Sequence, residues 1–235
     1  MTSVGILETG EPPPDLTVRF GRYGDMFKRM LGPDFAVRAY DVRRGEYPVE
    51  IEAHRGYLVT GSPAGVYEDH DWIEPLKAFL RSASGRARLV GICFGHQVMA
   101  EAFGGRVTKS TRGWGAGLHR YELIHPEPWM EDAAAFSIAV SHQDQVVALP
   151  PGSRVVAGNA FSPFGMLAYR DHQALSFQCH PEFDPDFTRA LIESRRDRLP
   201  DPDAALATLA QPDDRARVAD WIRYFLRGAT AAGDD

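Results

Sequence analysis

Apolar and polar positions follow two periods along the N-terminal half of the chain. Short apolar runs that suit strands alternate with stretches whose apolar residues recur every three or four positions, as on one face of a helix. The elements expected, in chain order, are Val4–Leu7, Tyr23–Leu31, Phe35–Asp41, Gly56–Thr60, Trp72–Ser82, Ala87–Cys93 and His96–Phe103. The almost wholly apolar run Ala87–Cys93 is typical of a central parallel strand covered on both faces. This alternation predicts an α/β fold with a mostly parallel, doubly wound sheet.

The pattern changes after Arg106 to short strands separated by turns, which we expect to add a partly antiparallel portion to the sheet. These strands are expected at Leu118–Leu123, Phe136–Val140, Arg154–Asn159, Phe164–Arg170 and Ala174–Gln178. Helices are expected again at Phe187–Arg198 and Asp213–Leu226, on either side of a Pro- and Asp-rich break at Leu199–Asp203.

Composition is that of an ordinary globular protein. The 235 residues are 44% hydrophobic and 25% charged, which is enough to build one sizeable core. No repeat, low-complexity linker or second core is visible. We therefore interpret residues 1–235 as a single domain with C-terminal helices over about residues 187–227 and a tail that frays after residue 228.

Charge and hydropathy exclude several classes of partner. The formal net charge is −6 and basic residues never form a run longer than a pair, so we expect no nucleic-acid partner. No stretch reaches the roughly 18 to 20 apolar residues that a membrane helix needs, and the N-terminus lacks a charged leader, so we expect no membrane partner and a cytoplasmic location. Both cysteines are expected to be free thiols in that compartment.

The strongest chemical signal is a cysteine between two glycines. In the segment Gly91-Ile92-Cys93-Phe94-Gly95, the thiol lies where a buried strand is expected to meet a helix, as in the elbow that presents the nucleophile of many hydrolases. Side chains flanking such a sharp turn would collide, which explains the glycines. The helix N-terminus would favour the thiolate of Cys93. Cys179 lacks these glycines and is expected to pack as a small hydrophobe.

A histidine and a carboxylate follow a later strand. His180 is succeeded by Pro181 and Glu182, and a carboxylate at this spacing can hold the imidazole in one tautomer while the imidazole moves protons. His-Pro-Glu alone would read as a solvated turn, but the separate Cys93 signal favours a triad. The remaining histidines show no metal-ligand spacing, and we expect no metal and no cofactor.

The turn Gly61-Ser62-Pro63 follows another expected strand and should lie at the same carboxyl edge of the sheet as Cys93. The backbone N–H of Gly61 and that of Phe94 could stabilise an oxyanion there. By itself Gly-Ser-Pro indicates no more than a turn.

Together, Gly61-Ser62-Pro63, the run GICFGHQ at residues 91–97, Ser141-His142-Gln143-Asp144 and His180-Pro181-Glu182 resemble, in order and spacing, the class I glutamine amidotransferases. The resemblance implies a flavodoxin-like α/β/α fold and a Cys-His-Glu triad that forms a γ-glutamyl thioester. By motif, Cys93 matches the nucleophile, His180 the base and Glu182 its orienting group, and Gly61 and Phe94 match the oxyanion loop. The residues matching positions that hold the α-amino and α-carboxylate groups of the substrate are Gln97, Ser141, His142, Gln143 and Asp144.

Within the family the chain is most similar to free-standing members that resemble the amidotransferase domain of GMP synthase, a group that includes γ-glutamyl peptidases. The softer signals are Phe94, the segment Gly65-Val66-Tyr67-Glu68 followed by Trp72-Ile73, and the Ser-His-Gln-Asp form. Gln143 stands where the synthase domains commonly have glycine, and a bulkier residue is expected to alter the pocket or its leaving-group side, so the identity of the leaving amine stays open.

Three functions remain open from the sequence. The first is a self-sufficient hydrolase acting on glutamine, a γ-glutamyl peptide or a conjugate, as the lack of a P-loop or synthetase half suggests. The second is a glutaminase subunit that delivers ammonia to a separate synthetase. The third is a non-catalytic binding module on the same fold.

Overall fold

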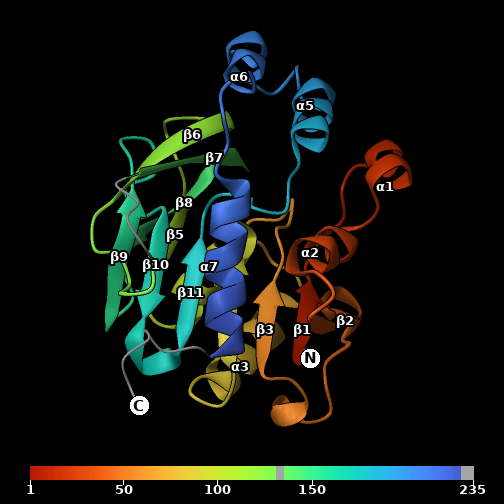
Figure 1. Cartoon of the computed structure of the whole chain (residues 1–235), viewed down its shortest axis with the longest axis vertical. Coiled ribbons are helices and arrows are strands. Elements are labelled where there is room, and N and C mark those ends of the chain that lie inside the picture. Colours follow the sequence, from red (N-terminus) through yellow and green to blue (C-terminus); the bar gives the residue numbers. More distant parts are fainter. Residues whose placement is uncertain (131–134, 229–235) are drawn as a thin grey trace.

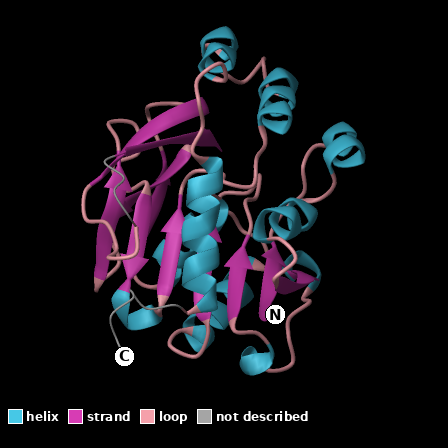
Figure 2. Cartoon of the chain, in the orientation of Figure 1, coloured by secondary structure: helices cyan, strands magenta, loops and turns pink. Residues whose placement is uncertain are grey.

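The computed structural model describes residues 1–130 and 135–228 and is built around one long mixed sheet. Nine strands follow the order β2-β1-β3-β4-β11-β10-β9-β6-β7, and β5 and β8 form a separate pair. The strands are β1 (Thr2–Glu8), β2 (Phe35–Asp41), β3 (Gly56–Val59), β4 (Arg88–Ile92), β5 (Arg106–Lys109), β6 (Gly115–Leu123), β7 (Ala135–His142), β8 (Asp144–Ala148), β9 (Ser153–Gly158), β10 (Met166–Tyr169) and β11 (Ala174–Phe177). Figures 1 and 2 show this sheet with helices in front of it and behind it.

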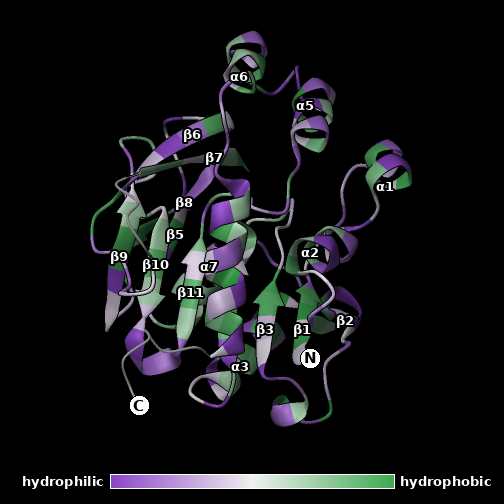
Figure 3. Cartoon of the chain, in the orientation of Figure 1, coloured by the Kyte–Doolittle hydropathy of each residue, from purple (hydrophilic) through white to green (hydrophobic). Residues whose placement is uncertain are grey.

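The helices form the outer layers. They are α1 (Pro14–Phe20), α2 (Tyr23–Leu31), α3 (Ile73–Ala83), α4 (Phe94–Ala102), α5 (Pro185–Ser194), α6 (Pro202–Thr208) and α7 (Arg215–Arg227). Apolar side chains of α2 and α7 pack with one face of the sheet, and those of α3 and α4 pack with the other. Figure 3 shows the resulting contrast between hydrophobic central strands and mixed helices such as α7. The fold is thus a three-layer, flavodoxin-like α/β/α arrangement, as the sequence predicted.

The sheet changes direction at β11. From β2 to β11 every neighbouring pair is parallel, which places the carboxyl ends of β1, β3, β4 and β11 at one edge. Beyond β11 the pairs with β10, β9, β6 and β7 are antiparallel. The predicted parallel half and added antiparallel portion are therefore both confirmed.

The C-terminal elements differ from the expectation. Helix α5 ends at Ser194 instead of continuing to Arg198, and the expected break at Leu199–Asp203 contains the start of α6. Asp201 caps this helix by accepting a hydrogen bond from Ala204 N, and Pro202 occupies its first turn. The same Pro and Asp residues that suggested a break are favourable at a helix start. The expected fraying after Gly228 concerns residues 229–235, which lie outside the described residues.

In the described part of the chain, no helix combines the length and apolar character required to cross a membrane.

Candidate active site

Cys93 occupies the sharp junction between β4 and α4. Its backbone has φ 54° and ψ −101°, a conformation that residues with a side chain rarely adopt. Its N–H donates to Phe177 O of the adjacent β11 at 2.8 Å, which secures the turn to the sheet. Strain of this kind persists only where the surroundings impose it, and it is often found at functional sites. Cys93 therefore lies where the sequence placed it, at the N-terminus of α4.

The two flanking glycines are required by close packing. A Cβ on Gly91 would lie 2.4 Å from Gly95 O, and one on Gly95 would lie 2.4 Å from Val59 O. Real Cβ atoms do not approach backbone oxygens so closely, so helix α4 could not cross β3 at this distance with larger residues. The elbow geometry thus depends on the absence of side chains at these positions.

His180 and Glu182 lie together beside Cys93. Nδ1 of His180 donates to Oε1 of Glu182 at 2.8 Å, and both side chains are buried. The His180 ring stacks on Phe183, with centroids 3.9 Å apart and planes 5° from parallel. The backbone N–H of His180 also donates to Ala139 O at 2.9 Å. Neighbours on several sides therefore fix the orientation of the imidazole.

The charges around His180 favour its protonated form. Burial alone would lower the pKa of His180, but the Glu182 carboxylate and a hydrogen bond with Cys93 oppose burial and raise the pKa above its ordinary value. A protonated imidazole beside a sulfur atom is the arrangement that stabilises a thiolate.

The loop after β3 is held against the elbow by Thr9. Oγ1 of Thr9 lies 3.0 Å from both Thr60 O and Gly61 O, and Thr9 N donates to Thr60 Oγ1 at 3.0 Å. Because a trans peptide directs its C=O and N–H in opposite directions, engaging Thr60 O turns the Gly61 N–H away from Thr9. A Cβ on Gly61 would lie 3.2 Å from His180 Cε1 and 3.8 Å from Cys93 Cβ. Gly61 is therefore adjacent to the side chains of both His180 and Cys93.

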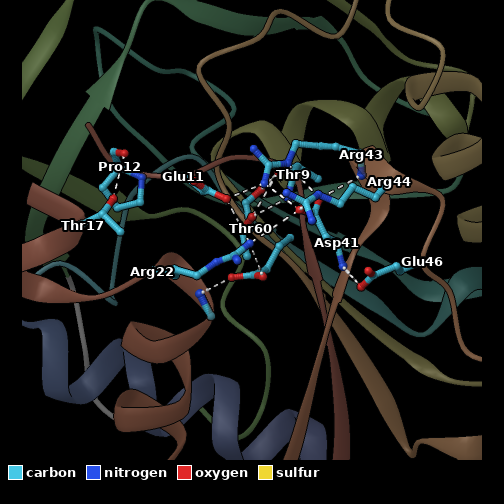
Figure 4. Close-up of polar contacts among 12 residues, drawn as sticks. Thr9, Glu11, Pro12, Thr17, Arg22, Asp41, Arg43, Arg44, Glu46 and Thr60 are labelled. Atoms are coloured by element: carbon cyan, nitrogen blue, oxygen red, sulfur yellow. Dashed lines mark hydrogen bonds and ion pairs between the residues drawn. The ribbon is translucent and has the colours of Figure 1, made fainter. Parts of the chain in front are cut away.

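An ion-pair network secures the ends of β1 and β2 next to this loop (Figure 4). Arg22 contacts Glu8 and Glu11, each at 3.1 Å, and Arg43 contacts Glu11 at 2.7 Å and Asp41 at 2.8 Å. Glu8 also accepts from the backbone at the start of α2. Burial raises the pKa of Glu8, against the opposing influence of Arg22. The network closes the carboxyl edge of β1 and β2 and leaves that of β3 and β4 for a ligand.

The residues expected to hold the substrate also lie at this edge. Gln97, Ser141, His142, Gln143 and Asp144 line one cavity of about 180 Å³ together with Cys93 and His180. The Gln97 amide is already engaged, donating to Asp144 O at 2.8 Å and to Gln178 Oε1 at 3.1 Å. The Asp144 carboxylate accepts from the Tyr67 hydroxyl at 3.0 Å, and burial raises the pKa of Asp144. Gln97 is therefore placed to position Asp144.

Ser141 and His142 differ in their relation to the cavity. Ser141 Oγ accepts from Arg195 at 2.7 Å. His142 is buried, burial lowers its pKa to about 3, and its ring nitrogens contact Asp144 O and Ser162 Oγ at 3.2 and 3.4 Å. A neutral, internally bonded His142 suits a structural role beside the pocket. Gln143 lies in the bend between β7 and β8 with its side chain partly exposed.

Several cavity residues were not singled out as site residues from sequence. Tyr23, Trp114, Phe183 and Arg195 line the same cavity. Trp114 lines the cavity and also packs against the apolar cluster of Ile192, Leu199 and Ala205. Tyr23 reaches the site from α2, Trp114 from the loop before β6 and Arg195 from the end of α5, all outside the motifs, whereas Phe183 directly follows Glu182.

Two other expectations concern the remaining thiol and metals. Cys179 is fully buried, and burial raises the pKa of its thiol well above the ordinary value, so it packs as the small hydrophobe that was expected. Within residues 1–130 and 135–228, no group of three or more His, Cys, Asp or Glu side chains is arranged to hold a metal ion.

Comparison with known proteins defines the class. Residues 23–194 match the class-I glutamine amidotransferase family. The chain is 30% identical over 184 residues to γ-glutamyl peptidase 4 of Arabidopsis thaliana, covering 74% of this chain and 73% of that protein. It is 27% identical over 209 residues to a glutamine amidotransferase-like protein of Schizosaccharomyces pombe, covering 82% and 84%. It is also 32% identical over 167 residues to the glutamine-hydrolysing GMP synthase of Thermus thermophilus, covering 68% of this chain and 32% of that longer protein.

Solved structures give the same fold. A glutamine amidotransferase from Thermotoga maritima superimposes with a TM-score of 0.74 at 19% identity, covering 97% of each chain. The chain therefore belongs to the class-I glutamine amidotransferase family. It is an enzyme of this cysteine-dependent group of amidotransferases and hydrolases.

The packing of Gly95 predicts that Gly95→Ala disturbs both stability and the elbow. The clash with Val59 O should lower the free energy of unfolding by about 1–3 kcal/mol, the usual cost of overpacking. Alkylation of Cys93 by iodoacetamide should slow because the turn must shift. Urea unfolding and mass spectrometry of the alkylated protein measure these effects.

Gly85→Ala is the matched control, because its Cβ would meet open space although its φ of 72° also favours glycine. It should lose some stability and keep the wild-type alkylation rate at Cys93. Wild-type unfolding and alkylation in Gly95→Ala would show that the close packing is not required.

If Gly61 has the oxyanion role expected from the sequence, the contacts of Thr9 predict that Thr9→Val lowers kcat for γ-glutamyl amide hydrolysis about tenfold or more with little change in KM, because a misaligned donor weakens binding of the transition state. Thr17→Val is the control: its hydroxyl also bonds backbone carbonyls, those of Pro12 and Pro13, but away from Gly61. Steady-state kinetics give kcat and KM for both variants. Equal losses of kcat in Thr9→Val and Thr17→Val would contradict the role assigned to Thr9.

Proposed function

We propose that this chain hydrolyses the γ-amide bond of a γ-glutamyl compound through a covalent intermediate on Cys93. The Cys93 thiolate attacks the γ-carbonyl carbon, and the new carbon–sulfur bond forms as a tetrahedral oxyanion develops. The N–H groups of Gly61 and Phe94 would bind that oxyanion. Protonated His180 gives its proton to the leaving amine as the carbon–nitrogen bond breaks, which leaves a γ-glutamyl thioester.

Water completes the cycle. Neutral His180 accepts a proton from the attacking water, and the thioester carbon–sulfur bond breaks to release glutamate and regenerate the thiolate. Glu182 acts as a positioning residue through its 2.8 Å bond to Nδ1, leaving Nε2 for the proton transfers. The α-amino and α-carboxylate groups of the substrate would contact the end of the cavity formed by Ser141–Asp144, with Gln97 holding Asp144 in place.

The observation that carries this proposal is that residues from separate parts of the chain meet at one cavity. Cys93, His180 and Gly61 come from three separate strand ends and meet at one cavity, with the sulfur in a strained elbow beside an imidazole whose pKa the buried Glu182 raises. A module that only bound ligands would have no need to retain this combination of strain, burial and charge.

A second candidate is a glutaminase that delivers ammonia to a separate synthetase. It is favoured by the 32% identity to the GMP synthase of Thermus thermophilus, where the match covers only about a third of the longer protein. The chemistry at Cys93 would be the same in both cases. The two functions differ in whether the isolated chain is active and in which amine leaves.

The mechanism predicts that Cys93→Ala abolishes turnover of glutamine, γ-glutamyl dipeptides, glutathione and glutathione conjugates, because no thioester can form. Mass spectrometry of the products provides the measurement. Cys179→Ala should stay active, since Cys179 is buried away from the cavity. Release of glutamate by Cys93→Ala would refute the covalent route, and no turnover by the wild-type protein unless a synthetase is added would favour the second candidate.

The electrostatics predict a pH effect of Glu182→Gln. The Glu182 anion raises the pKa of His180, so His180 remains a proton donor well into the alkaline range. Without that anion burial lowers the pKa, and the alkaline limb of kcat/KM should shift to lower pH, together with a loss of kcat. Profiles of kcat/KM against pH test this, with the exposed Glu193→Gln as control. An unchanged alkaline limb in Glu182→Gln would contradict the assigned pairing.

A further inference from the structure

Two polar side chains of the cavity take no part in the proposed hydrolysis. Tyr23 and Arg195 line the cavity together with Cys93 and His180. Tyr23 begins α2 and Arg195 follows α5, so they come from distant parts of the chain. The two side chains interact electrostatically with each other, and each also interacts with Cys93. They therefore share one region of the cavity wall near the sulfur.

The Tyr23 hydroxyl is a hydrogen-bond donor without a partner. Tyr23 is 6% exposed, and in the part of the chain that the structure describes its hydroxyl forms no hydrogen bond. The ring stacks on Phe183 with centroids 6.1 Å apart, and the next N–H, of Gly24, donates to Glu8 Oε1 at 3.0 Å. Burial raises the pKa of Tyr23 well above its ordinary value, so the hydroxyl keeps its proton. A buried donor of this kind is costly unless a ligand supplies an acceptor.

The Arg195 guanidinium is oriented but not neutralised. Its Nη1 donates to Ser141 Oγ at 2.7 Å, and the group lies 5.5 Å from the centre of the Trp114 ring. Among the described residues, no carboxylate lies within ion-pair distance of Arg195. Burial lowers the pKa of Arg195, which reflects the cost of keeping an unpaired cation away from water. Arg195 and Tyr23 thus present two unused donors to an anion.

Lys109 and Arg198 also line the cavity, but their surroundings differ from those of Arg195. Both side chains are exposed, so water solvates their charges. Lys109 also lies opposite Asp144 in the β5–β8 ladder and interacts with its carboxylate. Arg195 is the less exposed cation and therefore gains more from an anion that arrives with a ligand.

Substrate chemistry identifies that anion. Every γ-glutamyl compound has the α-carboxylate of its glutamyl group, whereas the leaving group has a carboxylate in some compounds and none in glutamine. Arg195 is anchored to Ser141 at the end of β7, and Asp144 at the start of β8 supplies a carboxylate suited to the α-amino group. Because the α-amino and α-carboxylate groups share one carbon atom, their partners must lie close together. A cation held by Ser141 and an anion three positions further along the chain suit this requirement.

We propose that Arg195 and Tyr23 bind the α-carboxylate of the glutamyl group and so select substrates that carry it. Arg195 supplies a positive charge with fork-shaped donors, and Tyr23 supplies a neutral donor. The inference rests on the proposed hydrolysis and adds two residues that lie outside the sequence motifs. It applies equally to a hydrolase and to a glutaminase subunit, because the glutamyl group is common to their substrates.

The test uses substrates whose leaving groups have no carboxylate. These are glutamine and γ-glutamyl-alanine amide, each compared with the derivative whose α-carboxylate is converted to a carboxamide. Values of kcat/KM are measured for wild type, Arg195→Gln, Tyr23→Phe, Lys109→Gln and Arg196→Gln. Arg196→Gln is the matched control, because Arg196 forms ion pairs with Glu193 and Asp203 outside the cavity.

In wild type the α-carboxylate substrate should exceed its α-amide by about tenfold or more, since hydrogen bonds between charged groups are the strong ones. Arg195→Gln should bring this ratio to within about threefold of one, and Tyr23→Phe should lower it by about threefold. The losses should appear mainly as a higher KM, because the α-carboxylate does not change during the reaction. Arg196→Gln should preserve the ratio.

Other results would overturn the inference. Equal rates for the α-carboxylate substrate and its α-amide in wild type would show that no cation binds this group, and this result needs no variant to fold. Equal fractional losses on both compounds in Arg195→Gln would assign Arg195 to the Cys93 thiolate. A loss of the ratio in Lys109→Gln but not in Arg195→Gln would assign the carboxylate to Lys109, and an unchanged ratio in Tyr23→Phe would remove Tyr23 from the subsite. Failure of the proposed hydrolysis differs from all of these, because wild type would then cleave none of the four compounds.

Discussion

The site depends on the close crossing of α4 over β3. Gly95 packs directly against Val59 O, with no room for a Cβ. Because Val59 ends β3 and Gly61 follows it by two residues, this contact fixes the Gly61 loop relative to the helix that begins after Cys93. One steric constraint therefore sets both the strained conformation of Cys93 and its distance from Gly61. Looser packing between α4 and β3 would move Gly61 away from Cys93.

The register of the parallel strands places His180 near Cys93 and Gly61. Phe177 of β11 pairs with Ile92 of β4, and Cys93 N donates to Phe177 O. The segments that follow Ile92 and Phe177 leave the sheet side by side. His180, three residues beyond Phe177, therefore lies close to Cys93. Its N–H then donates to Ala139 O of β7, which ties the antiparallel portion of the sheet to His180. The added strands thus support the position of His180.

Local patterns were sufficient to predict the parallel strands, the elbow and the His180–Glu182 pair, since each is encoded within a few adjacent residues. Tyr23–Leu31 and Phe35–Asp41 were predicted with the bounds that the structure has. Thr9 and Arg195 could not be found in this way, because their contacts with Thr60 and Ser141 span about 50 residues of sequence. Helix α6 was not predicted because the Asp and Pro residues that begin it are also common in loops. The features that the sequence does not reveal are mainly contacts between residues far apart along the chain.

The charged groups at the carboxyl edge illustrate how pairing separates structural roles from roles in binding. Arg22 and Arg43 share the carboxylates of Glu8, Glu11 and Asp41, so their charges are used in closing the β1–β2 side of the edge. Arg195 is anchored by a hydroxyl and an aromatic ring, which orient a guanidinium without neutralising it. The same edge of the sheet thus combines a side whose arginines are paired with carboxylates and a side where Arg195 is held by a hydroxyl and a ring, and Cys93 and His180 line the cavity on that second side.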